Sequence, residues 1–119
     1  MLLPDANQAP PFEGRNLYVH NPTVTLMRTT PEECAELGRI IGRKLSVAQG
    51  PTVLFVPLKG VSMIDVEGQP FYDADADAAL FAGLHETLAD SVEVHEVDTD
   101  INDPEFAVAM ADRLHELIA

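Results

Sequence analysis

Basic side chains are scarce in this chain, and one of them stands where a helix is predicted to begin. The sequence has 7 Lys and Arg against 20 Asp and Glu, a formal net charge of −13. Arg28 precedes Thr29 and Thr30, at a predicted helix N-terminus whose free N–H groups and dipole attract anions. An arginine there can hold a carboxylate or phosphate through two hydrogen bonds. The alternative is that Thr30 only caps the helix while Arg28 pairs with a nearby acid.

A second set of polar residues, Lys59, Gly60 and Ser62, follows the apolar run 52–56. Gly60 permits a close approach of the backbone, while Lys59 and Ser62 offer an ammonium and a hydroxyl group. The loop is not a Walker A motif, and the chain contains no Gly-x-Gly-x-x-Gly either. A plain turn after a strand explains the glycine equally well. We therefore treat the two sets together as a candidate anion subsite: Arg28, Thr29, Thr30, Lys59, Gly60 and Ser62.

Further polar residues are candidates for accessory roles in binding. His20 is kept because it ends a predicted strand. The accessory set is His20, Asn21, Asp65, Asn102 and Asp103. A hydrolase or transferase that uses His20, Lys59 and either Asp65 or Asp103 remains an alternative, but the chain has no nucleophile elbow and no convincing triad. No catalytic residue is assigned, and whether the chain is an enzyme stays open.

The spacing of possible metal ligands gives no support for a metal site. Asp73, Asp75 and Asp77 alternate with alanine, but an EF-hand loop would need glycine and glutamate where Ala78 and Leu84 stand. Acidic residues in a first helical turn follow the ordinary dipole preference. The four histidines and the single cysteine show no ligand spacing.

Predicted strands and helices alternate along the chain, and this order positions the candidate loops. Extended runs are predicted at 16–20, 23–27, 52–56 and 92–97, with helices that begin at Pro31, at Asp73 or Asp75, and at Pro104. Helices of this length act as crossovers between parallel strands. We expect an α/β, three-layer Rossmann-like fold with a mostly parallel sheet flanked by helices. Its carboxyl edge would bring together 28–30, 57–62 and 98–103.

Apolar periodicity predicts which side of each helix faces the core. The predicted inward residues are Cys34, Leu37, Ile41, Leu45 and Ala48, then Ala76, Leu80, Leu84 and Leu88, and finally Phe106, Met110, Leu114 and Leu117. Gly50 is expected in a left-handed conformation that ends the first helix. Gly38 and Gly42 are expected to pack closely against a strand or a dimer mate.

Composition and length indicate a single domain, residues 16–119, after a proline-rich arm or linker remnant at 1–15. No signal peptide or membrane span is visible, and one cysteine fits a reducing compartment, so we expect a cytoplasmic protein. The negative charge argues against nucleic acid or a membrane as partner.

Several segments together resemble a known family. They are 20–30 (HNPTVTLMRTT), 57–62 (PLKGVS), 69–73 (QPFYD) and 101–104 (INDP). They are similar to the C-terminal part of the Tm-one-like proteins, whose biochemical role is largely unassigned. That family is named after a plant protein that inhibits tobamovirus RNA replication, and its bacterial and fungal members are often described as ATP-binding.

The resemblance implies one Rossmann-like half of a larger architecture, and relatives that dimerise. It also implies that an N-terminal α/β subdomain, present in relatives before the position of Met1, would complete the protein. We therefore expect a ligand-binding domain for a nucleotide or another small anion, with ATP suggested by the family. An interaction or homodimerisation module without its own ligand is the alternative.

Overall fold

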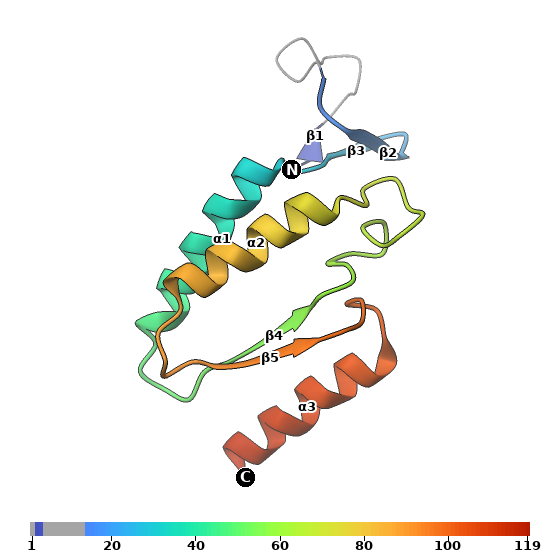
Figure 1. Ribbon diagram of the computed structural model, residues 1–119. Coiled ribbons are helices and arrows are strands. Elements are labelled where there is room, and N and C mark those ends of the chain that lie inside the picture. Colours follow the sequence, from blue (N-terminus) through green and yellow to red (C-terminus); the bar gives the residue numbers. More distant parts are fainter. Residues whose placement is uncertain (1, 4–13) are drawn as a thin grey trace. The chain divides into compact units, whose positions relative to one another are not determined.

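The computed structural model describes residues 2–3 and 14–119, which form a mixed α/β structure divided into two compact units (Figure 1). The N-terminal unit is Met1–Thr30 and the C-terminal unit is Pro31–Ala119. The arm predicted at 1–15 lies largely outside the described residues. Its boundary at residue 15 therefore stays a prediction.

The N-terminal unit contains an antiparallel sheet in the order β1-β3-β2. Its strands are β1 (Leu2–Leu3), β2 (Leu17–Asn21) and β3 (Val24–Met27). The side chain of Asn21 accepts hydrogen bonds from the N–H and the hydroxyl of Thr23, at 2.9 and 3.0 Å. The tight turn joins β2 directly to β3, and a connection this short permits only antiparallel pairing. Both runs are strands as predicted, but they form a hairpin and not part of a parallel sheet.

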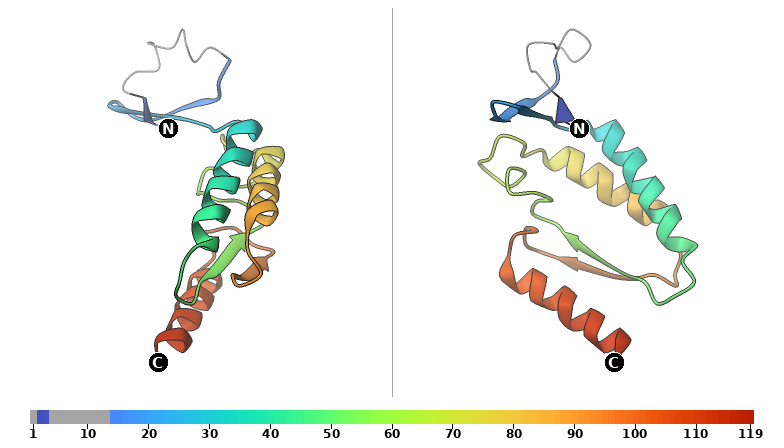
Figure 2. Two further views of the ribbon diagram at one scale, coloured as in Figure 1. Left: turned by 90° about the vertical axis from the view of Figure 1, so that its left-hand side faces the viewer. Right: turned by 180° about the vertical axis from the view of Figure 1, so that it is seen from behind.

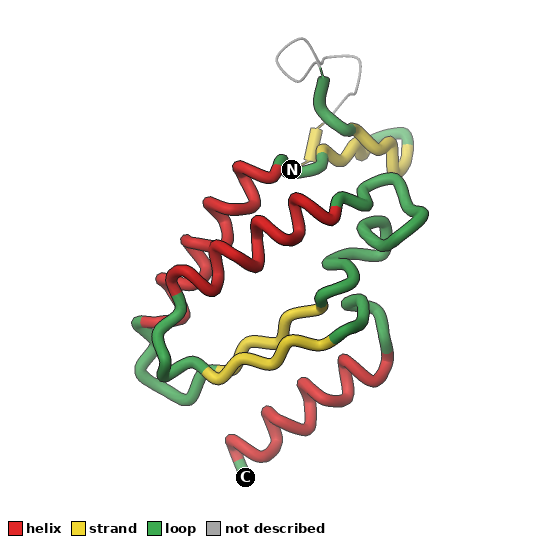
Figure 3. Tube along the Cα trace, in the orientation of Figure 1, coloured by secondary structure: helices red, strands yellow, loops and turns green. Residues whose placement is uncertain are grey.

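The C-terminal unit contains the one parallel pair among the described strands, β4 (Val53–Pro57) and β5 (Glu93–Val97). Helix α2 (Ala74–Thr87) is the crossover between them. The pair lies between the helices α1 (Pro31–Ser46) and α2 on one face and α3 (Pro104–Ile118) on the other (Figures 1 and 2). Figure 3 shows how short these strands are beside the helices. The α/β class is confirmed, whereas a full Rossmann sheet is not formed by the described residues.

Helices α1 and α2 touch backbone to backbone through glycine. A Cβ atom added at Gly38 would lie 2.3 Å from the carbonyl oxygen of Leu80, and one added at Gly83 would lie 2.4 Å from that of Ala35. No side chain fits between backbones at such distances. The close approach predicted for this stripe is confirmed, but the partner is α2 and neither a strand nor a dimer mate.

The glycine contact also decides which face of α1 is buried. Cys34, Gly38 and Gly42 are buried, whereas Leu37 and Ile41 are 43 % and 40 % exposed. The prediction that these two large residues point inward was wrong, because the small residues allow closer packing of the two helices. Gly50 has no positive φ, so its predicted left-handed conformation was also wrong.

Both later helices begin where the sequence predicts. Asp73 caps α2 by accepting a hydrogen bond from the N–H of Ala76 at 3.0 Å. Asp103 caps α3, and Phe106 is buried as expected. Met110 and Leu114 are exposed, in contrast to the prediction, because only a narrow two-stranded surface is available to cover them. Among the described residues, no helix is both long and apolar enough to cross a membrane.

Candidate functional site

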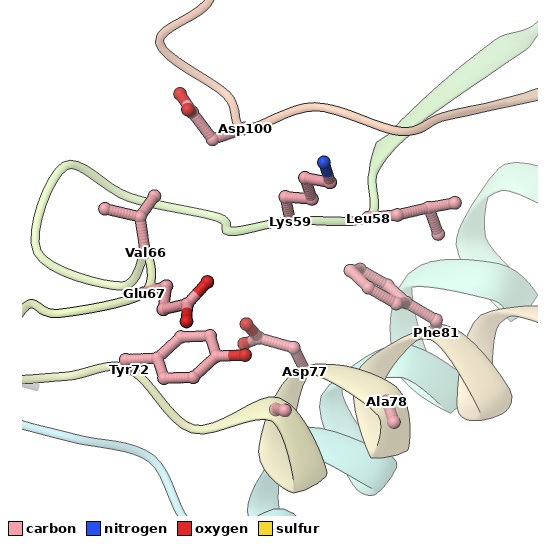
Figure 4. Close-up of a pocket in the computed structure, with 10 residues that line it drawn as sticks. Leu58, Lys59, Val66, Glu67, Tyr72, Asp77, Ala78, Phe81 and Asp100 are labelled. Atoms are coloured by element: carbon pink, nitrogen blue, oxygen red, sulfur yellow. The ribbon is translucent and has the colours of Figure 1, made fainter.

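A pocket of about 550 Å³ lies in the C-terminal unit, next to the carboxyl ends of β4 and β5 (Figure 4). The loops after both strands and the first turns of α2 surround it. Its lining residues are Leu58, Lys59, Val66, Glu67, Tyr72, Ala74, Asp77, Ala78, Phe81 and Asp100. Ligands of parallel α/β sheets collect at this edge, so the pocket is the candidate site.

The loops after β4 and β5 are held together by backbone hydrogen bonds. The N–H of Lys59 donates to the carbonyl of Thr99 at 2.9 Å, and that of Ile101 donates to Gly60 at 3.0 Å. A parallel bridge between Gly60 and Asp100 continues the pairing beyond the strands. The predicted convergence of 57–62 with 98–103 is therefore observed, and the backbone of Lys59 is held beside the pocket that this residue lines.

Gly60 is needed for the shape of this loop. Its φ is +152°, and an added Cβ would lie 2.1 Å from the carbonyl oxygen of Asp65. The predicted backbone approach is therefore made by the segment around Asp65. A ligand role for Gly60 stays a prediction.

Asp65 is buried behind the wall of the pocket and holds that wall in place through hydrogen bonds. Only 2 % of the residue is exposed, and its carboxylate accepts hydrogen bonds from the N–H of Val61 at 3.2 Å and of Asp73 at 3.3 Å. These bonds join the loop after β4 to the cap of α2. Asp65 positions the pocket and does not line it.

The polar groups of the pocket are mainly acidic. Figure 4 shows the carboxylates of Glu67 and Asp77 and the hydroxyl of Tyr72 turned toward the same space. Lys59 is the one basic residue in the lining, and its ammonium lies 3.8 Å from Asp98. The two side chains are 63 % and 80 % exposed, so this pair is too solvated to hold the Lys59 side chain in one position. Lys59 therefore remains available to an incoming anionic group.

The apolar part of the lining complements these charges. Leu58, Val66 and Phe81 form much of it together with the ring of Tyr72. A cavity with apolar walls and a few convergent polar groups is the common form of a small-molecule site. The arrangement suits an organic ligand with an apolar body, several hydroxyl or amino groups and one acidic group.

Other predicted residues lie elsewhere or have structural partners. Ser62 accepts a hydrogen bond from Ile64 at 3.1 Å, and Asn102 donates its N–H to Asp100 at 2.8 Å. Asp103 accepts from the hydroxyl of Thr99 at 2.7 Å and from the N–H of Glu105 at 2.9 Å. These hydrogen bonds hold the pKa of Asp103 below its usual value.

The remaining candidates belong to the N-terminal unit. Arg28 donates from its guanidinium to the hydroxyl of Thr29 at 3.2 Å, and its carbonyl accepts a hydrogen bond from Arg15 at 2.9 Å. Thr30 is the last residue of this unit, and His20 is exposed on β2. Their predicted convergence with Lys59 stays a prediction.

Sequence reasoning missed several residues that line the pocket, among them Glu67, Tyr72, Asp77 and Phe81. Asp77 was assigned only a dipole role, and Tyr72 entered only within the segment that carries the family resemblance. One available signal was topological, since the helix after β4 must begin at the carboxyl edge of the sheet. Residues in its first turns could have been included on that ground.

A second polar cluster on the α3 face of the sheet is structural. Arg113 donates to both carboxylate oxygens of Glu93 at 2.7 Å, and His95 lies 2.6 Å from Glu93. The pKa of Glu93 is lowered to about 2, mainly by its hydrogen bond with Arg113 and to a smaller extent by that with His95. The same contact raises the pKa of Arg113. Among residues 2–3 and 14–119, no group of three or more His, Cys, Asp or Glu could hold a metal ion.

Together, the fold and the pocket define an α/β domain with a cavity of ligand size at the carboxyl edge of a parallel strand pair. Residues 3–118 match the C-terminal domain of the uncharacterised protein family UPF0261. The chain belongs to this family.

Relatives from distant organisms support this assignment. The chain is 57 % identical over 104 residues to a UPF0261 protein of Clostridium tetani, with 87 % of this chain and 26 % of the relative covered. It is 52 % identical over 100 residues to the UPF0261 protein RA0729 of Rhizobium meliloti, with 82 % and 25 % covered. It is 35 % identical over 116 residues to the ToMV resistance protein Tm-1(GCR237) of Solanum lycopersicum, with 96 % and 15 % covered.

These comparisons confirm the resemblance to the Tm-one-like proteins. The chain spans about a quarter of the length of the bacterial relatives and less of the tomato protein.

Proposed function

We propose that this chain is a ligand-binding domain whose pocket at the carboxyl edge of β4 and β5 binds a small organic anion. The observation that carries the proposal is the meeting of two hydrogen-bonded loops and the start of α2 around about 550 Å³ of space. Lys59 would bind the acidic group of the ligand. In the longer members of the family, the rest of the polypeptide would supply the other wall of the site.

The charge of the pocket narrows the class of ligand. One ammonium group stands against the carboxylates of Glu67, Asp77 and Asp100. Like charges repel, so a ligand with several negative charges fits this lining poorly unless further basic groups join the site. Carboxylates are good acceptors for the hydroxyl groups of a sugar, and aromatic rings can pack against a base. A nucleoside monophosphate therefore suits the pocket better than free ATP.

Calorimetric titration of the 119-residue chain tests this proposal. We expect AMP to bind in the micromolar to millimolar range and to bind more tightly than ATP at equal ionic strength. Lys59→Ala should weaken AMP binding by about tenfold, because one charge-assisted contact is lost. Lys44→Ala is the matched control, since Lys44 is an exposed lysine of α1 outside the pocket lining.

Two results would contradict the proposal. One is the absence of heat at millimolar AMP and ATP while the circular dichroism spectrum remains that of a folded chain. The other is an equal loss of affinity in the Lys59 and Lys44 variants, which would reflect overall charge and not a site.

No observation favours the alternative in which His20, Lys59 and an acid act as catalysts. Asp65 and Asp103 bind backbone N–H groups, and His20 belongs to the other unit. A homodimer remains a proposal, but Gly38 and Gly42 no longer argue for it because α2 occupies that stripe.

A further inference from the structure

A groove of about 520 Å³ runs between β4 and α3, and it shares no residue with the pocket. Its lining residues are Pro51, Thr52, Val53, Leu54, Phe55, Met110, Arg113, Leu114 and Leu117. We call this surface the β4–α3 groove. Most of its side chains are apolar.

The groove follows the edge of β4 and not only one of its faces. Successive side chains of a strand point to opposite faces, so a surface on one face would contact every second residue. The β4–α3 groove contacts the consecutive residues 51–55. Among the described strands β4 pairs only with β5, so the edge along the groove carries no strand.

The backbone hydrogen bonds show which groups of β4 face that open edge. The carbonyl of Thr52 accepts from Glu93 at 3.0 Å, and the N–H of Leu58 donates to Val97 at 2.9 Å. Because backbone groups alternate in direction along a strand, the N–H and carbonyl groups of Val53 and Phe55 point away from β5. An additional strand could bind to all four.

The side chains around the open edge also lack cover. Val53, Leu54 and Phe55 are only partly buried, although the apolar run suggested a strand covered on both faces. Leu114 on α3 is 58 % exposed. A two-stranded sheet is marginal by itself, and an unpaired apolar edge is a template for another strand.

We propose that the β4–α3 groove receives a β-strand from the part of the longer family polypeptide that lies outside these 119 residues. The chain corresponds to about a quarter of the bacterial relatives, so most of their sequence is available to supply that strand. A second copy of this chain is disfavoured, because a net charge of −13 on each copy opposes self-association. The docking strand would carry apolar side chains toward Leu114 and Met110.

Amide hydrogen exchange tests this pairing residue by residue. It is measured on the 119-residue chain and on a full-length chimera in which this chain replaces the matching domain of the Clostridium tetani relative. The amides of Val53 and Phe55 should exchange about 100-fold more slowly in the chimera. The amides of Leu54 and Val56, which face β5, should be protected in both and provide the internal control.

Two substitutions in α3 distinguish a loss of docking in the groove from the general effect of a new surface charge. Leu114 and Val108 lie on the same helix and are 58 % and 57 % exposed, but only Leu114 lines the groove. Leu114→Glu should lower the melting temperature of the chimera while leaving that of the 119-residue chain unchanged. Val108→Glu should change neither.

Equal exchange at Val53 and Phe55 in chain and chimera would overturn the proposal. Protection that appears in the chain alone and rises with its concentration would also overturn it, in favour of a second copy. If Leu54 and Val56 are unprotected in the chimera, the hybrid is misfolded. In that case hydrogen exchange is measured on the natural Clostridium tetani protein at the residues aligned with β4. Slow exchange there supports the proposal, and fast exchange overturns it.

Discussion

The two faces of the β4–β5 pair are covered in different ways. On one face, α1 and α2 meet each other through Gly38 and Gly83 with no room for another atom. On the other face, α3 contacts the sheet through Phe106, whose ring lies edge-on to Phe55 at 6.1 Å, and through the Arg113–Glu93 pair. The open β4–α3 groove lies beside these contacts, along the edge of β4.

The difference shows which part of the C-terminal unit is closed by the unit's own residues. The α1–α2 contact is made between backbones, so its geometry tolerates no change in side-chain size. The α3 face depends on a few side chains and leaves apolar surface exposed, which is the usual mark of an interaction site. The C-terminal unit therefore has one closed face and one face that the proposed docking strand would complete.

The largest expected effect tests the closed face. Gly38→Val should destabilise the chain by more than about 4 kcal/mol, because its side chain would overlap the backbone of α2. Urea denaturation followed by circular dichroism measures the change. Gly50→Ala is the control, since nothing lies within 4 Å of its added Cβ, and it should stay within about 0.5 kcal/mol of the parent chain. A Gly38→Val chain as stable as the parent would refute the backbone contact.

A smaller effect is expected when the main apolar contact of α3 is removed. Phe106→Ala should cost about 3 kcal/mol, because this residue is buried against the sheet. Hydrogen exchange should show the loss in α3 while α1 and α2 stay protected. Val108→Ala, an exposed change on the same helix, should leave the exchange pattern as it was. Uniform loss of protection would mean that the two faces are not independent.

The smallest effect concerns the ion pair of the α3 face and its dependence on pH. The pKa of Glu93 is lowered from 4.5 to about 2 in the folded chain, so its contribution to stability is present above pH 4.5. That contribution should disappear as the pH falls from 4.5 to 2. Arg113→Met should lower the melting temperature by about 2–4 °C at pH 7 and flatten its decline across this window.

The control for the ion pair is Arg43→Met, because Arg43 is an exposed arginine of α1, which lies on the closed face and not on the α3 face. It should keep the decline with pH that the parent chain shows. Asp103 also has a lowered pKa, so part of that decline persists in every variant. Identical pH curves for the two arginine variants would show that the Arg113–Glu93 pair has no specific role.

Helix starts could be predicted from the sequence because their signals are local. Asp73 and Asp103 lie directly before their helices and cap them with their own side chains. The loop that carries Lys59 was found for the same reason, since a turn after an apolar run is visible within ten residues. The family resemblance, carried by four short segments, was also correct.

The acidic side of the pocket and the buried face of α1 could not be read in this way. Asp77 and Glu67 line the same pocket as Lys59 because the loop after β4 and the start of α2 both lie at the carboxyl edge of the strand pair. Leu37 faces outward because Gly38 and Gly83 let two backbones meet, and this depends on a residue of another helix.

Local signals in the sequence were sufficient for the helix starts, the extended runs and the membership of the family. Each depends on residues within a few positions of one another. The partner of the glycine stripe, the role of Asp65 and the open edge of β4 became apparent only in the folded chain. These features depend on which distant segments meet, and long-range packing sets that choice where local propensity cannot.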